Sequence, residues 1–445
     1  VKFLRLNKKI NNLKPNAMLH LKRKLAFLIF CAAFLICPKT DGQEQNWTHF
    51  RGSNLNAISE SANPPVTWTE TSNIRWKTDI PGKGWSSPVV FENQVWLTSA
   101  TEDGKKMNGV CLDFNSGKIL FDIQLFKPDS VQGKHSINTY ATPTPCIEKG
   151  FVYLHFGTFG TACVSTSDGK IIWKRTDLNC NHVQGPGSSP IIYKNLLILH
   201  IEGVDVQYIV ALDKTTGKTI WKTDRPVHVY EPLTPIGKKA YITPLIVNIK
   251  GKDLLISNGS AICQAFDPET GKEVWRVVQG TDSTIAMPVS ENGLVYFIPG
   301  FVSSPEGEKY TELIAVNPDG LDDIGSKNVV WKRKIPVLQL LTPLLKGGLI
   351  YMVDTQNNFL CLDAKTGQIV YTQKMKSKHY TSPVFANGLI YLISGKGEAT
   401  VIKEGTKFEI VAENKLPGEV FATPAILRNQ ILLRTDKSLY CIQAK

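Results

Sequence analysis

Short apolar segments separated by polar turns recur along the chain from about residue 73. The clearest unit runs from Ala211 to Trp221 and reads Ala-Leu-Asp-Lys-Thr-Thr-Gly-Lys-Thr-Ile-Trp; Ala265 to Trp275 repeats its eleven-residue spacing. Its Asp and Thr can bond the backbone of a tight turn, and its Gly supplies the positive φ that closes the turn. The pattern predicts two antiparallel strands joined by a hairpin, with a large aromatic anchor starting the second.

Looser copies of the unit begin at Cys111, Cys163 and Cys361, and a stretched copy runs from Ala315 to Trp331. A second repeated marker is Ser-Pro or Thr-Pro, which opens a short apolar strand where a missing N–H costs least. It occurs at Ser87-Pro88, Thr142-Pro143, Ser189-Pro190, Thr243-Pro244, Thr342-Pro343, Ser382-Pro383 and Thr423-Pro424, with Met287-Pro288 in the remaining slot. A Gly-apolar-apolar-Tyr strand follows in four copies, its Tyr ten residues after Pro143 and eight residues after the proline in the other three.

Each unit therefore contains four antiparallel strands, A to D, in roughly 40 to 56 residues, and there are eight units. Eight repeats of four antiparallel strands predict an all-β, eight-bladed β-propeller. The last unit ends at Lys445 without a strand D, and residues 73–79 supply one before the first Ser-Pro. We predict that this early strand completes the eighth blade and closes the ring, which removes the exposed sheet edges. The propeller then spans 73–445, after an N-terminal arm at 43–72.

The formal net charge of +12 is concentrated at the N-terminus, because residues 1–42 contribute nine Lys or Arg and one Asp. The rest of the chain carries about +4 without a basic run, so we expect no nucleic-acid partner. In the leader, Lys22-Arg23-Lys24 precedes the apolar run Leu25 to Cys37, which is typical of a secretory signal peptide. Met18 is a candidate true start. We expect an exported protein, periplasmic or secreted, and lipid attachment at Cys37 is disfavoured by the bulky Ile36.

Seven cysteines follow the leader, an odd number without a Cys-x-x-Cys spacing. Three of them, Cys111, Cys361 and Cys441, occupy a repeat position that holds Ala in other copies. We expect small buried strand residues here and no metal site.

Candidate binding residues lie in the loops from strand D to the next strand A, because these loops gather around one mouth of a propeller channel. The candidates are Trp85, His135, Asn138, Tyr140, His182, Gln184, His228, Tyr230, Glu231, Gln339, His379, Tyr380 and Glu419. Asp282 and Phe421 stand in the same loops. His135 and His182 each stand eight residues before their assigned proline, which predicts equivalent places in neighbouring blades. Converging His and Glu could bind a metal, protonate a substrate, or hold a sugar or peptide.

The Ala-x-Asp-x-x-Thr-Gly-x-x-x-Trp unit resembles the tryptophan-docking repeat of the pyrroloquinoline quinone (PQQ) type propellers, and the resemblance covers the chain from about Trp47. It implies that one aromatic residue per unit docks neighbouring repeats; these are Trp76, Phe121, Trp173, Trp221, Trp275, Trp331 and Tyr371. The opening Trp47-Thr-His-Phe50-Arg51-Gly52 is similar to exported PQQ-like repeat proteins related to the outer-membrane assembly factor BamB, a scaffold without a catalytic site.

Two functions follow from the resemblance. The first is an exported, non-catalytic scaffold that binds a protein, small-molecule or glycan partner at the channel mouth, with no cofactor and a possible association with the cell envelope. The second is an enzyme, either a PQQ dehydrogenase with Ca²⁺ or an activity centred on His and Glu. The quinoprotein enzymes often carry a disulfide between adjacent cysteines, and this sequence has no adjacent Cys pair. Residues cannot be matched one by one to a Ca²⁺ ligand set, which favours the scaffold.

Overall fold

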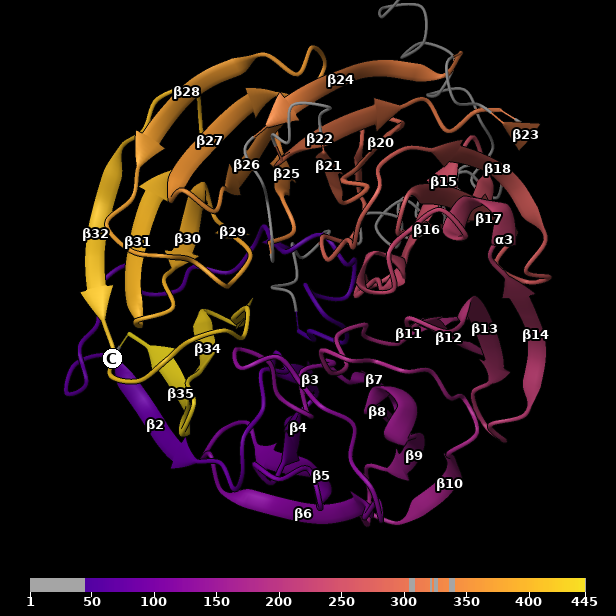
Figure 1. Cartoon of the computed structure of the whole chain (residues 1–445). Helices are drawn as coiled ribbons and strands as arrows, with labels where there is room; N and C mark the ends of the chain where they lie inside the picture. Colours follow the sequence, from indigo (N-terminus) through magenta and orange to yellow (C-terminus); the bar gives the residue numbers. More distant parts are fainter. Residues whose placement is uncertain (1–44, 304–308, 321, 324–326, 336–340, 445) are drawn as a thin grey trace, which may run out of the picture. The chain divides into compact units, whose positions relative to one another are not determined.

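The computed structural model describes residues 45–303, 309–320, 322–323, 327–335 and 341–444. They form eight sheets arranged as blades around one axis (Figure 1). Helix is limited here to α3 (Val227–Tyr230) and to 3-10 turns at Gly157–Phe159 and Ile236–Lys238. The predicted all-β, eight-bladed propeller is therefore confirmed. The leader at 1–42 lies outside the described residues, and within them no helix is long and apolar enough to cross a membrane.

Each blade has four strands in A-to-D order from the axis outward. Blade 1 contains β3 (Val89–Phe91), β4 (Gln94–Ala100), β5 (Met107–Asp113) and β6 (Ile119–Phe126), and blade 2 contains β7 (Cys146–Glu148), β8 (Phe151–His155), β9 (Thr161–Ser165) and β10 (Ile171–Arg175). Blade 3 contains β11 (Ile191–Tyr193), β12 (Leu196–Glu202), β13 (Gln207–Asp213) and β14 (Thr219–Asp224), and blade 4 contains β15 (Leu245–Ile249), β16 (Lys252–Gly259), β17 (Ile262–Phe266) and β18 (Glu273–Val278). Blade 5 contains β19 (Val289–Glu291), β20 (Leu294–Phe297), β22 (Lys309–Val316) and β24 (Val329–Ile335), and blade 6 contains β25 (Leu344–Lys346), β26 (Leu349–Val353), β27 (Asn358–Asp363) and β28 (Ile369–Lys374). Blade 7 contains β29 (Val384–Ala386), β30 (Leu389–Ile393), β31 (Glu398–Lys403) and β32 (Ile410–Lys415), and blade 8 contains β33 (Ala425–Leu427), β34 (Gln430–Arg434), β35 (Ser438–Gln443) and β2 (Ile74–Asp79). Three short strands add to blades 7, 4 and 5: β1 (Ile58–Ser59), β23 (Asp322–Asp323) and β21 (Phe301–Ser303).

The ring closes through the N-terminal strand, as predicted. β2 pairs antiparallel with β35, with Trp76 opposite Cys441, and the indigo β2 lies beside the yellow β35 in Figure 1. Blade 8 thus combines the two ends of the described chain. The pairing covers the edge of β35 that would otherwise be exposed at the seam.

Neighbouring blades dock through an indole and a turn. The indole N–H of Trp173 in blade 2 donates to Lys214 O in the hairpin turn of blade 3, at 3.0 Å. In that turn Gly217 has φ +72°, and a Cβ there would lie 2.8 Å from the Trp173 ring. Trp76, Trp221 and Trp331 donate in the same way to Phe114 O, Pro268 O and Ala364 O. The repeat's Gly is therefore needed for its backbone conformation and for room beside the indole.

One predicted strand start has to be corrected. Strand β7 begins at Cys146, so the blade 2 marker is Thr144-Pro145, two residues after the predicted Thr142-Pro143. Two Thr-Pro pairs in succession caused this error. With Pro145 in place, Tyr153 follows its proline by eight residues, as in the other copies.

The N-terminal arm crosses the ring at the far ends of the A strands. Trp47 exchanges two backbone hydrogen bonds with Val90 of blade 1, and Ile147 N of blade 2 donates to Thr48 O at 2.9 Å. On the opposite side β1 pairs parallel with β29 of blade 7. Trp47 is fully buried. The arm therefore closes one end of the channel.

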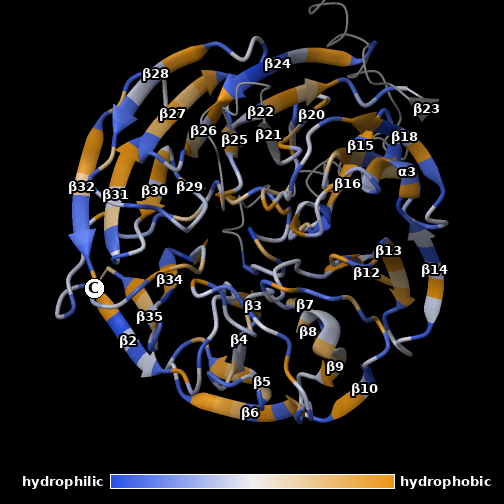
Figure 2. Cartoon of the chain, viewed as in Figure 1, coloured by the Kyte–Doolittle hydropathy of each residue, from blue (hydrophilic) through white to orange (hydrophobic). Residues whose placement is uncertain are grey.

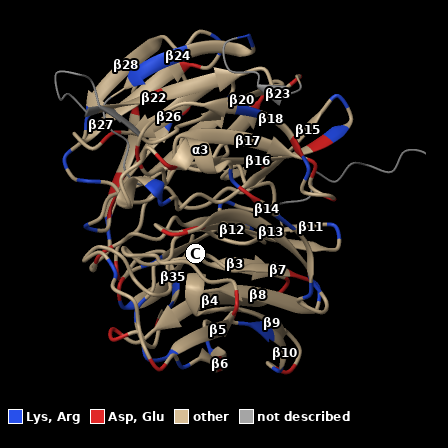
Figure 3. Ribbon diagram, turned by 45° about the vertical axis from the view of Figure 1, so that its right-hand side comes forward, with Lys and Arg blue, Asp and Glu red and all other residues tan. Residues whose placement is uncertain are grey.

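Burial follows strand position. All seven residues of β12 are buried, because inner strands pack against blades on both faces, whereas the outer β24 alternates half-buried and exposed residues. Figure 2 shows apolar residues concentrated on the strands, and Figure 3 shows Lys, Arg, Asp and Glu interspersed along strands and loops. The seven cysteines from Cys111 onward are buried and unpaired.

Candidate functional site

Hydroxyl groups at the start of the A strands link neighbouring blades around the axis. Ser87 N donates to Thr144 Oγ1 at 2.9 Å, Thr144 N to Ser189 Oγ at 3.0 Å, and Ser189 N to Thr243 Oγ1 at 3.2 Å. Across the ring, Met287 N donates to Thr342 Oγ1, Thr342 N to Ser382 Oγ and Ser382 N to Thr423 Oγ1 at 3.0–3.2 Å. We call these residues the hydroxyl ring: Ser87, Thr144, Ser189, Thr243, Thr342, Ser382 and Thr423.

The hydroxyl ring is incomplete at two places. Blade 5 has Met287 at this position, so it offers no hydroxyl to blade 4. At the closure between blades 8 and 1, Ser87 Oγ is buried and has no hydrogen-bond partner among the described residues. Ser87 is 2% exposed. A buried hydroxyl without a partner costs free energy, which marks this position as unusual.

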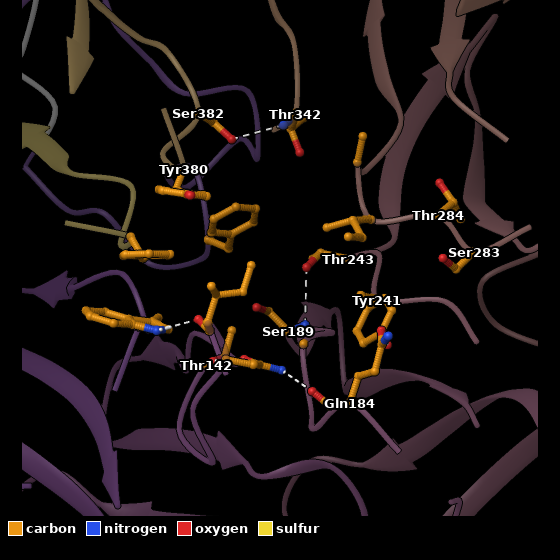
Figure 4. Close-up of a pocket in the computed structure, with 18 of the residues that line it drawn as sticks. Thr142, Gln184, Ser189, Tyr241, Thr243, Ser283, Thr284, Thr342, Tyr380 and Ser382 are labelled. Carbon is orange, nitrogen blue, oxygen red and sulfur yellow. Dashed lines mark hydrogen bonds between the residues drawn. The ribbon is translucent and has the colours of Figure 1, made fainter. Parts of the chain in front are cut away.

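The hydroxyl ring opens into a cavity of about 400 Å³ on the side away from the arm. Every blade contributes at least one lining residue, and Phe50 of the arm reaches it from below. Figure 4 shows ring residues on opposite sides, with Ser382 beside Thr342 and Ser189 beside Thr243. The volume is in the range of small-molecule sites. Since the arm closes the far end, the cavity is a blind funnel.

One wall of the funnel is a column of three aromatic rings. Trp85 of blade 1 stacks on Phe421 of blade 8 with ring centroids 4.6 Å apart, and Phe421 stacks on Tyr380 of blade 7 at 4.2 Å. Trp85 Nε1 donates to Ile137 O at 3.0 Å, which fixes the orientation of the indole. Such a column offers a rigid apolar surface from three different blades.

The opposite wall is polar. Tyr241 donates its hydroxyl to Gln184 Oε1 at 2.6 Å, and Asn138 Nδ2 donates to Gln184 O at 2.8 Å. Asp282 is the one carboxylate among the described lining residues, and it accepts the amide N–H of Ser283. Those lining residues include no Lys or Arg. The funnel thus pairs an apolar wall with hydrogen-bonding groups.

Of the residues predicted from the sequence, five line this cavity: Trp85, His135, Asn138, Gln184 and Tyr380. Asp282 and Phe421, from the same loops, also line it. Gln339 lies outside the described residues. Seven others do not line it: Tyr140, His182, His228, Tyr230, Glu231, His379 and Glu419.

His182 and His135 do not occupy equivalent places. His182 is buried and accepts the amide N–H of Thr158 at Nε2, 2.8 Å away. Burial lowers its pKa well below the usual value, so it stays neutral. The predicted equivalence depended on Pro143; counted from Pro145, His135 stands ten residues before its proline and His182 eight before Pro190.

Tyr230 and Glu202 belong to a separate buried network between blades 3 and 4. The Tyr230 hydroxyl donates to the Glu202 carboxylate, which also pairs with Arg225 at 2.7 Å. Burial raises the pKa of Glu202 despite Arg225. His228, Glu231 and Glu419 are exposed, and Tyr140 is buried with its hydroxyl donating to Gln132 O. The predicted convergence of His and Glu is therefore wrong among the described residues.

Sequence reasoning missed the hydroxyl ring, Phe50 and Tyr241 as lining residues. The repeated Ser/Thr-Pro marker is the available signal for the ring, but by itself it predicts only a strand start. Phe50 and Tyr241 carry no local signal, because the arm and the blade 4 loop meet the cavity only after folding.

A PQQ site with Ca²⁺ does not fit these residues. Ca²⁺ takes six to eight oxygen ligands, typically including several carboxylates. The cavity lining provides Asp282 alone, and no group of three or more His, Cys, Asp or Glu side chains in the described part of the chain could hold a metal.

Fold and cavity together define an eight-bladed propeller with a blind axial funnel. A sequence profile described as outer membrane protein assembly factor BamB matches residues 201–320 and 259–407. Over these residues the chain is similar to the PQQ-like β-propeller repeat proteins.

Three known proteins show how far the similarity extends. BamB of Escherichia coli K12 is 24% identical over 410 residues, covering 88% of this chain and 93% of BamB. Tetrathionate hydrolase of Acidithiobacillus ferrooxidans is 19% identical over 353 residues, covering 73% of this chain; the match spans only 65% of the hydrolase. Quinohemoprotein alcohol dehydrogenase of Comamonas testosteroni superposes with a TM-score of 0.62 at 11% identity, covering 92% and 82% of the two chains. Likeness at this identity shows the fold alone.

Proposed function

We propose that this protein is an exported, non-catalytic binding propeller that holds a ligand or protein partner in the axial funnel at its channel mouth. The observation that carries the proposal is the blind cavity of about 400 Å³ to which all eight blades contribute. A rigid ring that places loops from eight blades around one opening is suited to recognition. The relation to BamB, named an outer membrane protein assembly factor, favours a protein partner in the cell envelope.

Within the described ranges, the funnel residues form no arrangement for covalent or acid–base catalysis. His135 and Asp282 line it, and no hydrogen bond links the two side chains to each other. Cys180 lies 3.5 Å from His182 Nδ1, but both are buried, and burial raises the pKa of the thiol to about 11. A neutral, inaccessible thiol is a poor nucleophile. These features support binding over turnover.

Export is the second part of the proposal. It is supported by the basic segment Lys22-Arg23-Lys24 followed by the apolar run 25–37. The BamB name adds support, since an assembly factor for outer-membrane proteins works in the envelope. The proposed binding function needs no cofactor. It favours a protein partner over a glycan.

The test is retention of Ca²⁺ by the purified chain after incubation with PQQ and Ca²⁺ and exhaustive dialysis, measured by elemental analysis. The binding proposal predicts no stoichiometric Ca²⁺, because one carboxylate cannot form the site. One Ca²⁺ per chain, retained only with PQQ and accompanied by dye-linked alcohol oxidation, would establish a quinoprotein enzyme and overturn the proposal.

A further inference from the structure

Two buried guanidinium groups lie close to the hydroxyl ring without a counter-ion. Arg51 of the arm is 1% exposed and Arg434 of β34 is 2% exposed. Neither pairs with a carboxylate among the described residues, since both contact only neutral oxygen atoms. Burial lowers the pKa of each to about 9, which leaves both protonated at neutral pH.

Both guanidiniums are bonded to the backbone that carries ring hydroxyls. Arg434 Nη1 donates to Ser86 Oγ at 2.6 Å and to Ser86 O at 3.3 Å, directly before Ser87. Arg51 donates to Thr342 O at 3.2 Å and to Pro343 O at 2.8 Å, while its Nε has no partner. Buried unpaired charge is costly and creates a long-range field in a low-dielectric interior. The two guanidiniums therefore contribute a positive potential at the floor of the funnel.

The hydroxyl ring itself presents donors. Six of its hydroxyl oxygens accept a backbone N–H from the neighbouring blade, so their own O–H protons remain available to a ligand. Ser87 also lines the funnel, and its buried Oγ has no hydrogen-bond partner in the described part of the chain. Each of the six oxygens is polarised by the N–H group that it accepts, and the Arg51 and Arg434 guanidiniums lie nearby. Hydroxyl donors in this setting favour a negatively charged oxygen as their acceptor.

We propose that the floor of the funnel binds the carboxylate of an organic ligand, whose apolar body lies along the column formed by Trp85, Phe421 and Tyr380. This inference rests on the proposed binding function and adds the ligand's chemistry. A carboxylate accepts about four hydrogen bonds, which matches several converging hydroxyl donors. A phosphate normally recruits direct Arg or Lys contacts, and the lining residues that the structure describes include neither. The carboxylate comes either from a small free acid or from the C-terminus of a partner polypeptide.

Calorimetry on the full chain tests this with matched probes. The probes are 3-phenylpropionate against 3-phenylpropionamide, and the tripeptide Ala-Ala-Phe with a free C-terminus against the same peptide amidated. We expect each acid to bind at least about tenfold more tightly than its amide. A preference for the small acid over the peptide assigns a metabolite source, and the reverse assigns a chain terminus. Equal binding of acid and amide, or no binding of either acid, overturns the carboxylate site.

Two variants locate the site. Arg434→Met removes one cation but also three hydrogen bonds, so its fold must be checked by circular dichroism. Ser87→Ala removes a hydroxyl without a partner and should keep the fold intact. We expect it to weaken acid binding severalfold and to leave amide binding unchanged, whereas the exposed Ser136→Ala has no effect. Unchanged acid binding by Ser87→Ala contradicts the assignment. Neither result alters the Ca²⁺ test, so the two proposals fail independently.

Discussion

At the scale of single residues, the contact between a turn glycine and an indole explains why the repeat unit keeps both. Gly217 and Gly293 have similar backbone conformations, with φ of +72° and +78°. A Cβ on Gly217 would meet the Trp173 ring at 2.8 Å, whereas a Cβ on Gly293 would meet nothing within 4 Å. Substituting Gly293 therefore tests the cost of the backbone conformation alone, whereas substituting Gly217 adds the cost of disturbed packing between blades.

We expect Gly293→Ala to lower the free energy of unfolding by about 1 kcal/mol, which is the cost of a positive φ for alanine. Gly217→Ala should lower it by about 1–3 kcal/mol more, because the indole must move. Urea denaturation of both variants measures the difference. Equal losses would show that the glycine serves the turn alone.

The sequence already indicated a positive φ at Gly217, because Asp213, Thr216 and Gly217 form a turn signature. Its packing against Trp173 could not be derived locally, since the two residues belong to different blades. The same limit applies to Ser87, whose missing partner is evident only once blades 8 and 1 meet.

At the scale of elements, the N-terminal arm acts as the base of the funnel. It contacts blade 1 through Trp47, blade 2 through Thr48 and blade 7 through Ala57. Phe50 of the same arm reaches the cavity. An element that joins blades on opposite sides of the axis should stabilise the ring as well as close it.

We expect Trp47→Ala to weaken arm docking by about 3–5 kcal/mol, because it empties a fully buried indole site. Hydrogen exchange should then accelerate at the amides of Ile147 and Phe385, which donate to Thr48 O and Ala57 O. Amides of β13, which the arm does not bond, serve as the internal control. An unchanged rate at Ile147 and Phe385 would mean that the arm stays docked without its indole.

Element types were more predictable from the sequence than element registers. The strand order and the closing strand β2 followed from the repeat, because period and turn chemistry are local properties. The start of β7 was misplaced by two residues because Thr142-Pro143 and Thr144-Pro145 satisfy the same rule. That slip produced the false equivalence of His135 and His182, so a small register error changed a predicted site.

At the scale of the whole molecule, function depends on loops that meet only in the closed ring. The sequence correctly placed Trp85 and Tyr380 in loops of the channel mouth, since loop position follows from blade geometry. Which side chains turn inward depends on packing between blades, so His182 and Tyr230 entered buried networks instead. The blind end also depends on the arm, which no repeat pattern describes.

The funnel mouth, and not the outer rim, is the proposed binding surface. Ile137 and Ile220 provide a matched pair: both are exposed, at 38% and 54%, but Ile137 lines the funnel and Ile220 lies on the outer strand β14. The decisive measurement is in-cell photo-crosslinking from each position, followed by intact-mass spectrometry that detects protein and small-molecule adducts alike. We predict a discrete adduct from position 137 and none from position 220. Adducts from position 220 alone, or none from position 137, would contradict this prediction.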